Sequence, residues 1–226
     1  MKQIIAVEGL VCCGKGALCR RFAQETEFVY INAGLIFRGV AWLFEKQIIS
    51  EIDDIFPFLS SGKVIYAWES EEDTVFAVNA FDKSHELLTL EIGEKASQLA
   101  AQQKSFLSLA KVVQTIASDY DKIICDGRGV GSIIFPEANY RFYVTADTQI
   151  RARRRFIDLN NQGISVSFKD VMKDIRRRDE RDKNREFCPL HPHPLATILH
   201  TDATSIEENV ALMITKVFVE NANIRR

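Results

Sequence analysis

The stretch IIAVEGLVCCGKGAL, residues 4–18, decides the fold because it joins an apolar run, a glycine loop and a helical pattern in that order. The run Ile4–Val7 is short and rich in β-branched residues, which favours a buried parallel strand. The loop Gly9–Lys15 has the spacing Gly-x-x-x-x-Gly-Lys of a phosphate-binding loop. Such a loop turns backbone N–H groups and a helix N-terminus toward phosphate oxygens, and its lysine reaches the β- and γ-phosphates. We therefore expect this loop to bind a nucleotide phosphate.

The loop is incomplete at its end. The full motif closes with Ser or Thr, whose hydroxyl helps to hold Mg²⁺, but Gly16 and Ala17 follow the lysine here. Cys12 and Cys13 lie at a helix N-terminus beside a lysine, where a thiol is expected to have a lowered pKa and to be reactive. The alternative interpretation of the stretch is a chance glycine turn before an ordinary helix.

The composition excludes several classes of protein. The 226 residues fit one domain, or one domain with an insert, and 46% hydrophobic residues can form a sizeable core. The 29 Lys and Arg balance 31 Asp and Glu, and a net charge of −2 argues against a general nucleic-acid binder. We find no signal peptide pattern and no apolar run near the ~20 residues of a membrane span. The five cysteines, 12, 13, 19, 125 and 188, fit neither a disulfide framework nor a zinc site. We expect a reduced, cytoplasmic enzyme.

The rest of the chain alternates strands with helices, which predicts a parallel α/β sheet. We expect strands at 28–31, 122–126, 140–144 and 197–200, and helices at 34–47, within 86–118 with a break near 102–104, at 167–186 and after Ser205. The last helix begins at a capping box, Ser205–Glu208, and carries Ile206, Val210, Met213 and Val217 on one face. Two further strands at 63–68 and 74–78, joined by an acidic turn at 69–73, break the alternation and predict an insert packed on the core.

The triplet Asp126-Gly-Arg128 is a candidate for the site. It follows a predicted core strand, at the edge where ligands bind in such sheets. Asp126 could hold Mg²⁺ through water, and Arg128 could bind a phosphate with two hydrogen bonds. The alternative is a tight glycine turn with a solvated ion pair.

The helix 167–186 has an apolar stripe that becomes charged without changing face. Phe168, Val171 and Ile175 begin the stripe, and the same spacing continues through Arg178, Asp182 and Arg185. Charges that point toward the core are costly unless they meet partners, so we expect a cleft that binds an anion. Arginines at 151 and 153–155, before the glycine turn 160–163, could form a lid over a triphosphate. Solvated, salt-bridged surface helices are the alternative for both segments. We interpret His191-Pro-His193 as a rigid loop rather than a metal site, and Phe37, Trp42 and Phe44 as core.

Taken in order, these motifs resemble bacterial cytidylate kinases over nearly the whole chain. The resemblance is carried by the glycine loop, Ile31–Arg38, Ala96–Gln98, Asp126–Arg128, Phe135–Pro136 and Arg178–Arg185. It implies a P-loop nucleoside monophosphate kinase fold: a parallel sheet flanked by helices, a small substrate-binding insert with a short β-sheet, and a short lid. The core would span about 1–36, 104–150 and 165–226, the insert about 37–103 and the lid about 151–164. It implies ATP-dependent phosphorylation of CMP and dCMP with Mg²⁺. We expect a monomer that binds small-molecule nucleotides, with neither nucleic acid nor membrane as a partner.

The resemblance also implies roles for individual side chains. The ATP phosphates would be contacted by Gly9, Cys12, Cys13, Gly14, Lys15, Gly16, Ala17 and, from the lid, Arg154. Arg38 and Arg128 would hold the CMP phosphate, and Ser97 and Arg185 would reach the cytosine. Arg178 and Asp182 would reach the substrate phosphate and ribose. Lys15, Arg128, Arg178 and Asp182 would be the catalytic residues.

Departures from the family pattern fall on both sides of the expected site. Cys12 replaces a glycine, and its β-carbon strains a loop that favours glycine geometry, while Ala17 replaces the hydroxyl residue. On the base side, Gly129 replaces a carboxylate that reads the cytosine edge, and Ala33 lacks a hydroxyl. An arginine of the family pattern would fall near Phe106, where this chain has none, although Lys104 or Lys111 could take its place. Altered or relaxed base specificity, or a degenerate nucleotide-binding homologue with little transfer activity, are therefore the alternatives. The pattern predicts that Gly129→Asp raises selectivity for CMP, if the backbone there tolerates a β-carbon.

Overall fold

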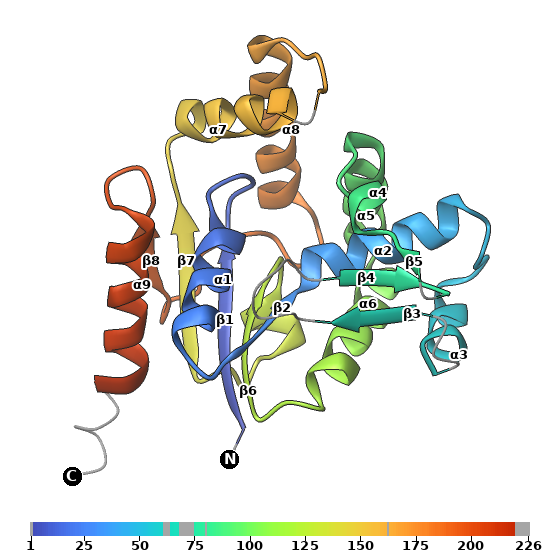
Figure 1. The fold of residues 1–226 in the computed structure, drawn as a ribbon, viewed down its shortest axis with the longest axis horizontal. Helices are drawn as coiled ribbons and strands as arrows, with labels where there is room; N and C mark the ends of the chain where they lie inside the picture. Colours follow the sequence, from blue (N-terminus) through green and yellow to red (C-terminus); the bar gives the residue numbers. More distant parts are fainter. Residues whose placement is uncertain (1, 61–63, 68–74, 80, 162, 220–226) are drawn as a thin grey trace.

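A parallel sheet forms the centre of the molecule in a computed structural model that describes residues 2–60, 64–67, 75–79, 81–161 and 163–219 (Figure 1). In the described residues this sheet has five strands in the order β2-β6-β1-β7-β8, all parallel. Their bounds are β1 Gln3–Gly9, β2 Val29–Asn32, β6 Lys122–Asp126, β7 Tyr140–Thr145 and β8 Thr197–His200. The parallel α/β sheet expected from the alternation of elements is confirmed.

Helices cover both faces of this sheet because its central strand is apolar on both sides. Ile4 and Ala6 pack with α2, Ala33–Glu45, and α6, Gln103–Ala117. Ile5 and Val7 point the other way and pack with α1, Lys15–Glu25, and α9, Ile206–Ile214. A continuous run of β-branched residues is what a strand buried on two faces requires.

The carboxyl ends of three strands meet at one edge of the sheet. Asp126, the last residue of β6, pairs with Val7 of β1 on one side and with Asn32 of β2 on the other. The glycine loop begins at Gly9 and α1 follows it, so the loop and Asp126 lie at the same edge. Ligands bind at this edge in open parallel sheets, and it is where the candidate residues gather.

A small antiparallel sheet lies beside α2, as the insert prediction required. It has the order β3-β4-β5, with β3 Val64–Ala67, β4 Val75–Val78 and β5 Phe81–Asp82. Gly39 of α2 makes the contact possible, since a β-carbon there would lie 2.2 Å from the Phe76 ring. The pattern missed β5, which is two exposed residues long, and the expected turn at 69–73 lies outside the described residues.

Between α2 and α6, the described residues form four further helical segments. Residues Ile52–Asp54 form a 3₁₀ turn that leads into α3, Ile55–Ser60, and α4 spans Ser84–Leu87. Helix α5, Leu90–Ala101, packs on α2, and the predicted break before α6 falls at Gln102. A boundary between core and insert at residue 37 would cut α2, and the division into core, insert and lid remains a prediction.

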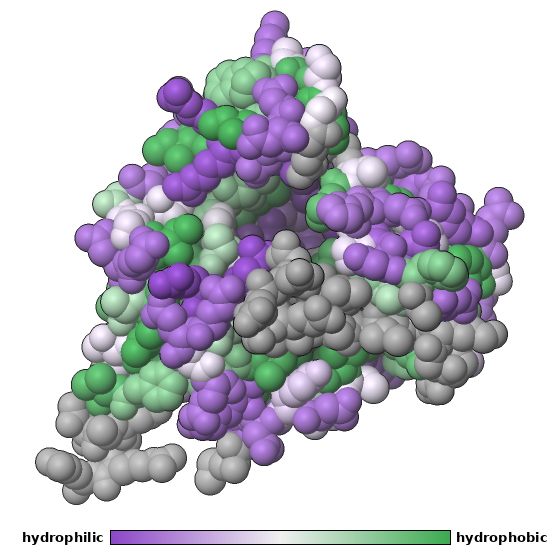
Figure 2. All heavy atoms as spheres, viewed as in Figure 1, coloured by the Kyte–Doolittle hydropathy of each residue, from purple (hydrophilic) through white to green (hydrophobic). Residues whose placement is uncertain are grey.

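Helices α7, Thr148–Asn161, and α8, Phe168–Asn184, pack together as an arm above the carboxyl edge of the sheet (Figure 1). Val11 of the glycine loop packs with Ala152 and Ile175 of the arm. Figure 2 shows the surface hollowed between this arm and the part of the molecule that carries α2 and α5. Within the described ranges, no helix is both long and apolar enough to cross a membrane.

The predicted apolar faces of α8 and α9 are buried except at the first residue of each helix. Val210, Met213 and Val217 are buried, but Ile206 is 41% exposed. Phe168 is 40% exposed in the same way, although Val171 and Ile175 are buried. In both helices the exposed residue directly follows the capping serine, Ser205 or Ser167, at the end of the helix beyond the packed face.

Candidate active site

The loop Gly9–Lys15, hereafter the phosphate loop, has a backbone that explains its glycines. Gly9 has φ of 147°, and a β-carbon there would lie 2.0 Å from the carbonyl oxygen of Val144. Gly14 has φ of 91°, in the region that favours glycine. Cys12 has φ of 56°, which is unfavourable for a residue with a β-carbon. The strain predicted at Cys12 is therefore present.

The side chain of Lys15 folds back over the phosphate loop. Its Nζ donates to the carbonyl oxygens of Gly9, at 3.1 Å, and Leu10, at 2.7 Å, and lies 3.7 Å from Cys13 Sγ. These contacts hold the ammonium where the loop closes on the start of α1. The lysine is thus positioned at the loop that the spacing predicted for it.

The expected activation of the loop thiols is wrong for Cys12. Burial raises the pKa of the Cys12 thiol, and the positive charges of Arg178, Arg155 and Lys15 only partly oppose that effect. The helix N-terminus and the nearby lysine suggested a reactive thiolate, but desolvation outweighs them. All five cysteines are free thiols.

Asp126 is a buried carboxylate beside the phosphate loop. Its Oδ1 accepts a hydrogen bond from the Tyr30 hydroxyl at 2.9 Å. Burial raises the pKa of Asp126, while the charge of Lys15 and the bond from Tyr30 oppose the rise. Among the described residues no three His, Cys, Asp or Glu side chains form a metal cluster. A single carboxylate fits Mg²⁺, which is usually held by one or two carboxylates, substrate phosphates and waters.

Asp182, one charged residue of the α8 stripe, meets a partner in the cleft. Arg128 Nε donates to Asp182 Oδ2 at 2.7 Å, and both side chains are mostly buried. Burial alone would raise the pKa of Asp182, but the charges of Arg128, Arg185 and Arg178 lower it below the ordinary value. Asp182 is therefore ionised and fixes the direction of the Arg128 guanidinium.

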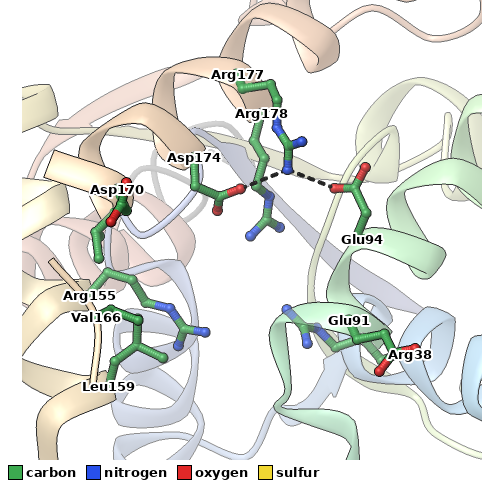
Figure 3. Close-up of a pocket in the computed structure, with 11 residues that line it drawn as sticks. Arg38, Glu91, Glu94, Arg155, Leu159, Val166, Asp170, Asp174, Arg177 and Arg178 are labelled. Atoms are coloured by element: carbon green, nitrogen blue, oxygen red, sulfur yellow. Dashed lines mark hydrogen bonds and ion pairs between the residues drawn. The ribbon is translucent and has the colours of Figure 1, made fainter. Parts of the chain in front are cut away.

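A cavity of about 320 Å³ brings most of the predicted site residues together. They come from the phosphate loop, α2, α5, the loop after β6 and α8, and are Cys12, Lys15, Arg38, Ser97, Asp126, Arg128, Arg178, Asp182 and Arg185. We call this the central cavity. An adjoining outer cavity of about 390 Å³ lies between α5 and the arm and shares Arg38, Arg155 and Arg178 with it (Figure 3).

Three guanidinium groups face one space at the junction of the two cavities. Arg38, Arg155 and Arg178 point into it from α2, α7 and α8 (Figure 3). Burial, together with the charges of Arg178 and Arg155, lowers the pKa of Arg38 to about 10. Within the described part of the chain, the side chains of Arg155 and Arg178 make no hydrogen bond or ion pair. Like charges brought together in this way mark a site for an anion.

The position of Arg38 depends on residues that the sequence patterns did not identify. Its Nη1 donates to the carbonyl oxygens of Leu87, at 2.7 Å, and Thr89, at 3.2 Å. Gly93 of α5 leaves room for the guanidinium, since a β-carbon there would lie 2.7 Å from Arg38 Nη2. A glycine inside a helix pattern was the signal available for this contact.

The arginines of α7 divide into different roles. Arg151 was expected in a lid over a triphosphate, but it is 1% exposed and pairs with Asp179 at 2.8 Å. It also donates to the carbonyl oxygen of Val11, at 3.0 Å, so it helps to hold the backbone of the phosphate loop in place. Arg154 donates to Thr201 Oγ1, at 2.9 Å, next to Gly14 and outside the residues that line the two cavities. Arg155 is the arginine of this run that reaches both cavities.

Two of the base-side departures contact one another. Gly129 has φ of 66°, and a β-carbon there would lie 2.5 Å from Cys188 Sγ and 2.8 Å from the Phe106 ring. The condition set for Gly129→Asp, a position that tolerates a β-carbon, is therefore not met, because the space for that side chain is filled. Phe106 is fully buried, and the guanidinium of Arg185 lies 5.7 Å from the centre of its ring. No local sequence signal could have shown that these positions touch.

Comparison with known proteins agrees with these observations. The family model described as cytidylate kinase matches residues 5–218. Cytidylate kinase of Pectobacterium carotovorum is 32% identical, with 93% of this chain and 94% of that protein covered. Cytidylate kinase of Pasteurella multocida is 31% identical, with 96% of this chain and 95% of that protein covered. The crystal structure of an uncharacterized protein from Eubacterium ventriosum superposes with a TM-score of 0.52 at 12% identity, over 96% of this chain and 98% of that one, which shows likeness of fold. Because the family model matches nearly the whole chain, residues 5–218, this chain belongs to the cytidylate kinase family.

Proposed function

We propose that this protein transfers the γ-phosphoryl group of ATP to CMP and dCMP. Its family and the names of its relatives support this reaction. The observation that carries the proposal is the placement of the phosphate loop lysine and of Arg38, Arg128 and Arg178 around one central cavity. Transfer between two phosphate groups needs positive charge on both sides of the moving phosphoryl group, and these side chains supply it.

On the donor side, the phosphate loop binds ATP. Backbone N–H groups at the start of α1 and the ammonium of Lys15 contact the β- and γ-phosphates, which replace the carbonyl oxygens that Lys15 now contacts. Arg154, held at Thr201 beside Gly14, adds charge next to the loop. Mg²⁺ bound with ATP supplies further positive charge to the phosphate oxygens, and Asp126 is the carboxylate that would hold it, through water.

On the acceptor side, Arg38, Arg128 and Arg178 bind the phosphate of CMP. An oxygen of that phosphate attacks the γ-phosphorus, the bond to the bridging oxygen breaks, and ADP leaves without a covalent enzyme intermediate. Asp182 contacts the ribose, and Ser97 and Arg185 contact the cytosine. Asp182→Asn should then weaken the binding of CMP more than that of dCMP, because dCMP lacks the 2′-hydroxyl. An equal loss of binding for both nucleotides would contradict the ribose contact.

A coupled assay of ADP release tests the proposal. CMP, dCMP, UMP, AMP and GMP are compared at fixed ATP and Mg²⁺, and kcat/KM should be highest for CMP and dCMP. Equal turnover of UMP would indicate relaxed base specificity. No turnover with any monophosphate, together with measurable binding of ATP, would indicate a nucleotide-binding homologue and overturn the proposal.

The proposal includes a cytoplasmic monomer that acts on free nucleotides and binds neither nucleic acid nor membranes. The balanced charge, 29 basic against 31 acidic residues, supports this. Size-exclusion chromatography should give one elution volume that does not change with protein concentration.

A further inference from the structure

One arginine of α8 joins two residues of α5 across the cleft. Arg181 Nη2 donates to Glu94 Oε1 at 2.8 Å, and its Nη1 donates to Glu94 Oε2 at 3.1 Å. The same Nη1 donates to Ser97 Oγ at 3.1 Å. A guanidinium that meets both oxygens of a carboxylate is fixed in its plane as well as in its position. Glu94 thus determines where Arg181 can reach Ser97.

This contact sets the direction of the Ser97 hydroxyl. A guanidinium nitrogen can only donate, so Ser97 Oγ accepts from Arg181 and its own proton points away from that nitrogen. Ser97 lines the central cavity, where a ligand group could receive the proton. The pair therefore presents Ser97 to the cavity as a hydrogen-bond donor, although neither Glu94 nor Arg181 lines that cavity.

Neighbouring charges keep the pair in this form. The hydrogen bond from Arg181 and the charges of Arg181 and Arg177 lower the pKa of Glu94 against the effect of burial, so Glu94 stays ionised at neutral pH. Arg177 also approaches Glu94, at 3.4 Å, but it is 57% exposed and pairs more closely with Asp174, at 3.0 Å (Figure 3). Arg177 therefore contacts Glu94 from the more exposed side, and unlike Arg181 it makes no hydrogen bond to Ser97.

Asp182, the next residue of α8 after Arg181, orients a different side chain of the central cavity. Asp182 fixes Arg128, and Arg181 fixes Ser97, so one turn of α8 orients a group on each side. We propose that Arg181 and Glu94 are positioning residues for the acceptor nucleotide, which hold Ser97 as a donor without touching the nucleotide themselves. This inference rests on the proposed function, because the donor serves an acceptor that enters the central cavity.

Steady-state kinetics of four variants test the inference. Arg181→Met and Glu94→Gln should raise KM for CMP by roughly tenfold, the loss expected for one oriented hydrogen bond, with kcat and KM for ATP nearly unchanged. Ser97→Ala should raise KM by the same factor. Arg177→Met is the matched control, since it removes a cation from Glu94 but leaves the bond to Ser97, and its KM should equal that of the wild type.

A double variant separates positioning from a general structural role. Arg181→Met combined with Ser97→Ala should be no worse than either change alone, because both remove the same contact. Independent, multiplying losses would overturn the inference, as would an unchanged KM for CMP in Arg181→Met. Arg181→Lys should have nearly the same raised KM for CMP as Arg181→Met, since an ammonium cannot bond Glu94 and Ser97 in one plane. Wild-type turnover of CMP is measured first: its absence would overturn the proposed function and this inference together, whereas its presence with an unchanged KM in Arg181→Met would overturn this inference alone.

Discussion

At Gly129 the space that a side chain would need is already filled. The Phe106 ring and Cys188 Sγ occupy the volume that a β-carbon would need, at 2.8 Å and 2.5 Å. Positions 106 and 129, the two places where this chain departs from the expected family pattern, are therefore next to one another. Arg185 lies over the Phe106 ring, so the ring that fills the space also supports a residue expected to contact the base.

Gly129→Asp should destabilise the protein instead of raising its selectivity. The side chain would overpack a filled space and occupy a backbone conformation that favours glycine, which together cost roughly 1–3 kcal/mol. Thermal unfolding measures the loss. Gly163→Asp is the matched control, because Gly163 has φ of 75° with nothing within 4 Å of its β-carbon position, so it carries the backbone cost alone. A Gly129→Asp variant as stable as Gly163→Asp would contradict the steric argument.

Lys15→Ala should abolish phosphoryl transfer. The lysine also donates to the carbonyl oxygens of Gly9 and Leu10, so a small loss of stability, about 1 kcal/mol per hydrogen bond, should accompany the loss of activity. Turnover of CMP and circular dichroism are measured on the same preparation. Unchanged turnover would contradict the assignment of the phosphate loop.

Among the elements, α7 and α8 of the arm are joined by a buried ion pair that no local pattern indicated. Arg151 lies on α7 and Asp179 on α8, and their side chains are 1% and 7% exposed. The arginine also donates to the carbonyl oxygen of Val11 in the phosphate loop. Sequence reasoning assigned Arg151 to a lid because it considered one helix at a time. The carboxylate that pairs with this buried arginine comes from the other helix.

Asp179→Asn should destabilise the fold strongly. Removing one partner leaves the Arg151 charge buried without its ion pair, which typically costs about 3–5 kcal/mol. Asp174→Asn, which breaks the exposed pair with Arg177, should cost less than about 1 kcal/mol. Chemical denaturation compares the two, and equal losses would contradict the special role of the buried pair.

The elements that could be predicted were those with a local signal. The bounds of β6 and β8 agree with the expected ranges, and the cap at Ser205 is confirmed by a hydrogen bond from the backbone N–H of Glu208 to the serine side chain. The π-helical turn Val130–Ile134 after Gly129 was missed, because nothing in a short glycine segment distinguishes it from an ordinary turn.

Over the whole molecule, the sequence predicted which charged residues would gather but not how they are held. The spacing on α8 was enough to place Arg178, Asp182 and Arg185 on one face, because the periodicity of a helix is fixed. The supports come from elsewhere: Glu94 and Gly93 on α5, and Phe106 on α6. Contacts between distant segments depend on the packed structure, and apart from Gly93, a glycine inside a helix pattern, the sequence offered no signal for these supports.

The three guanidinium groups that face one space have a consequence for how fast substrates arrive. The protein as a whole carries a net charge of −2, so its outer field repels anions weakly, while Arg38, Arg155 and Arg178 attract them into the cleft. A nucleotide should therefore be steered toward its binding place by long-range attraction before any contact forms. Adding KCl should lower kcat/KM for CMP while kcat stays nearly constant, since dissolved ions shorten the reach of this attraction to about 10 Å at 0.1 M. Arg155→Gln should flatten that dependence on salt, and an unaltered slope in this variant would mean that capture at the cleft does not rely on its charge.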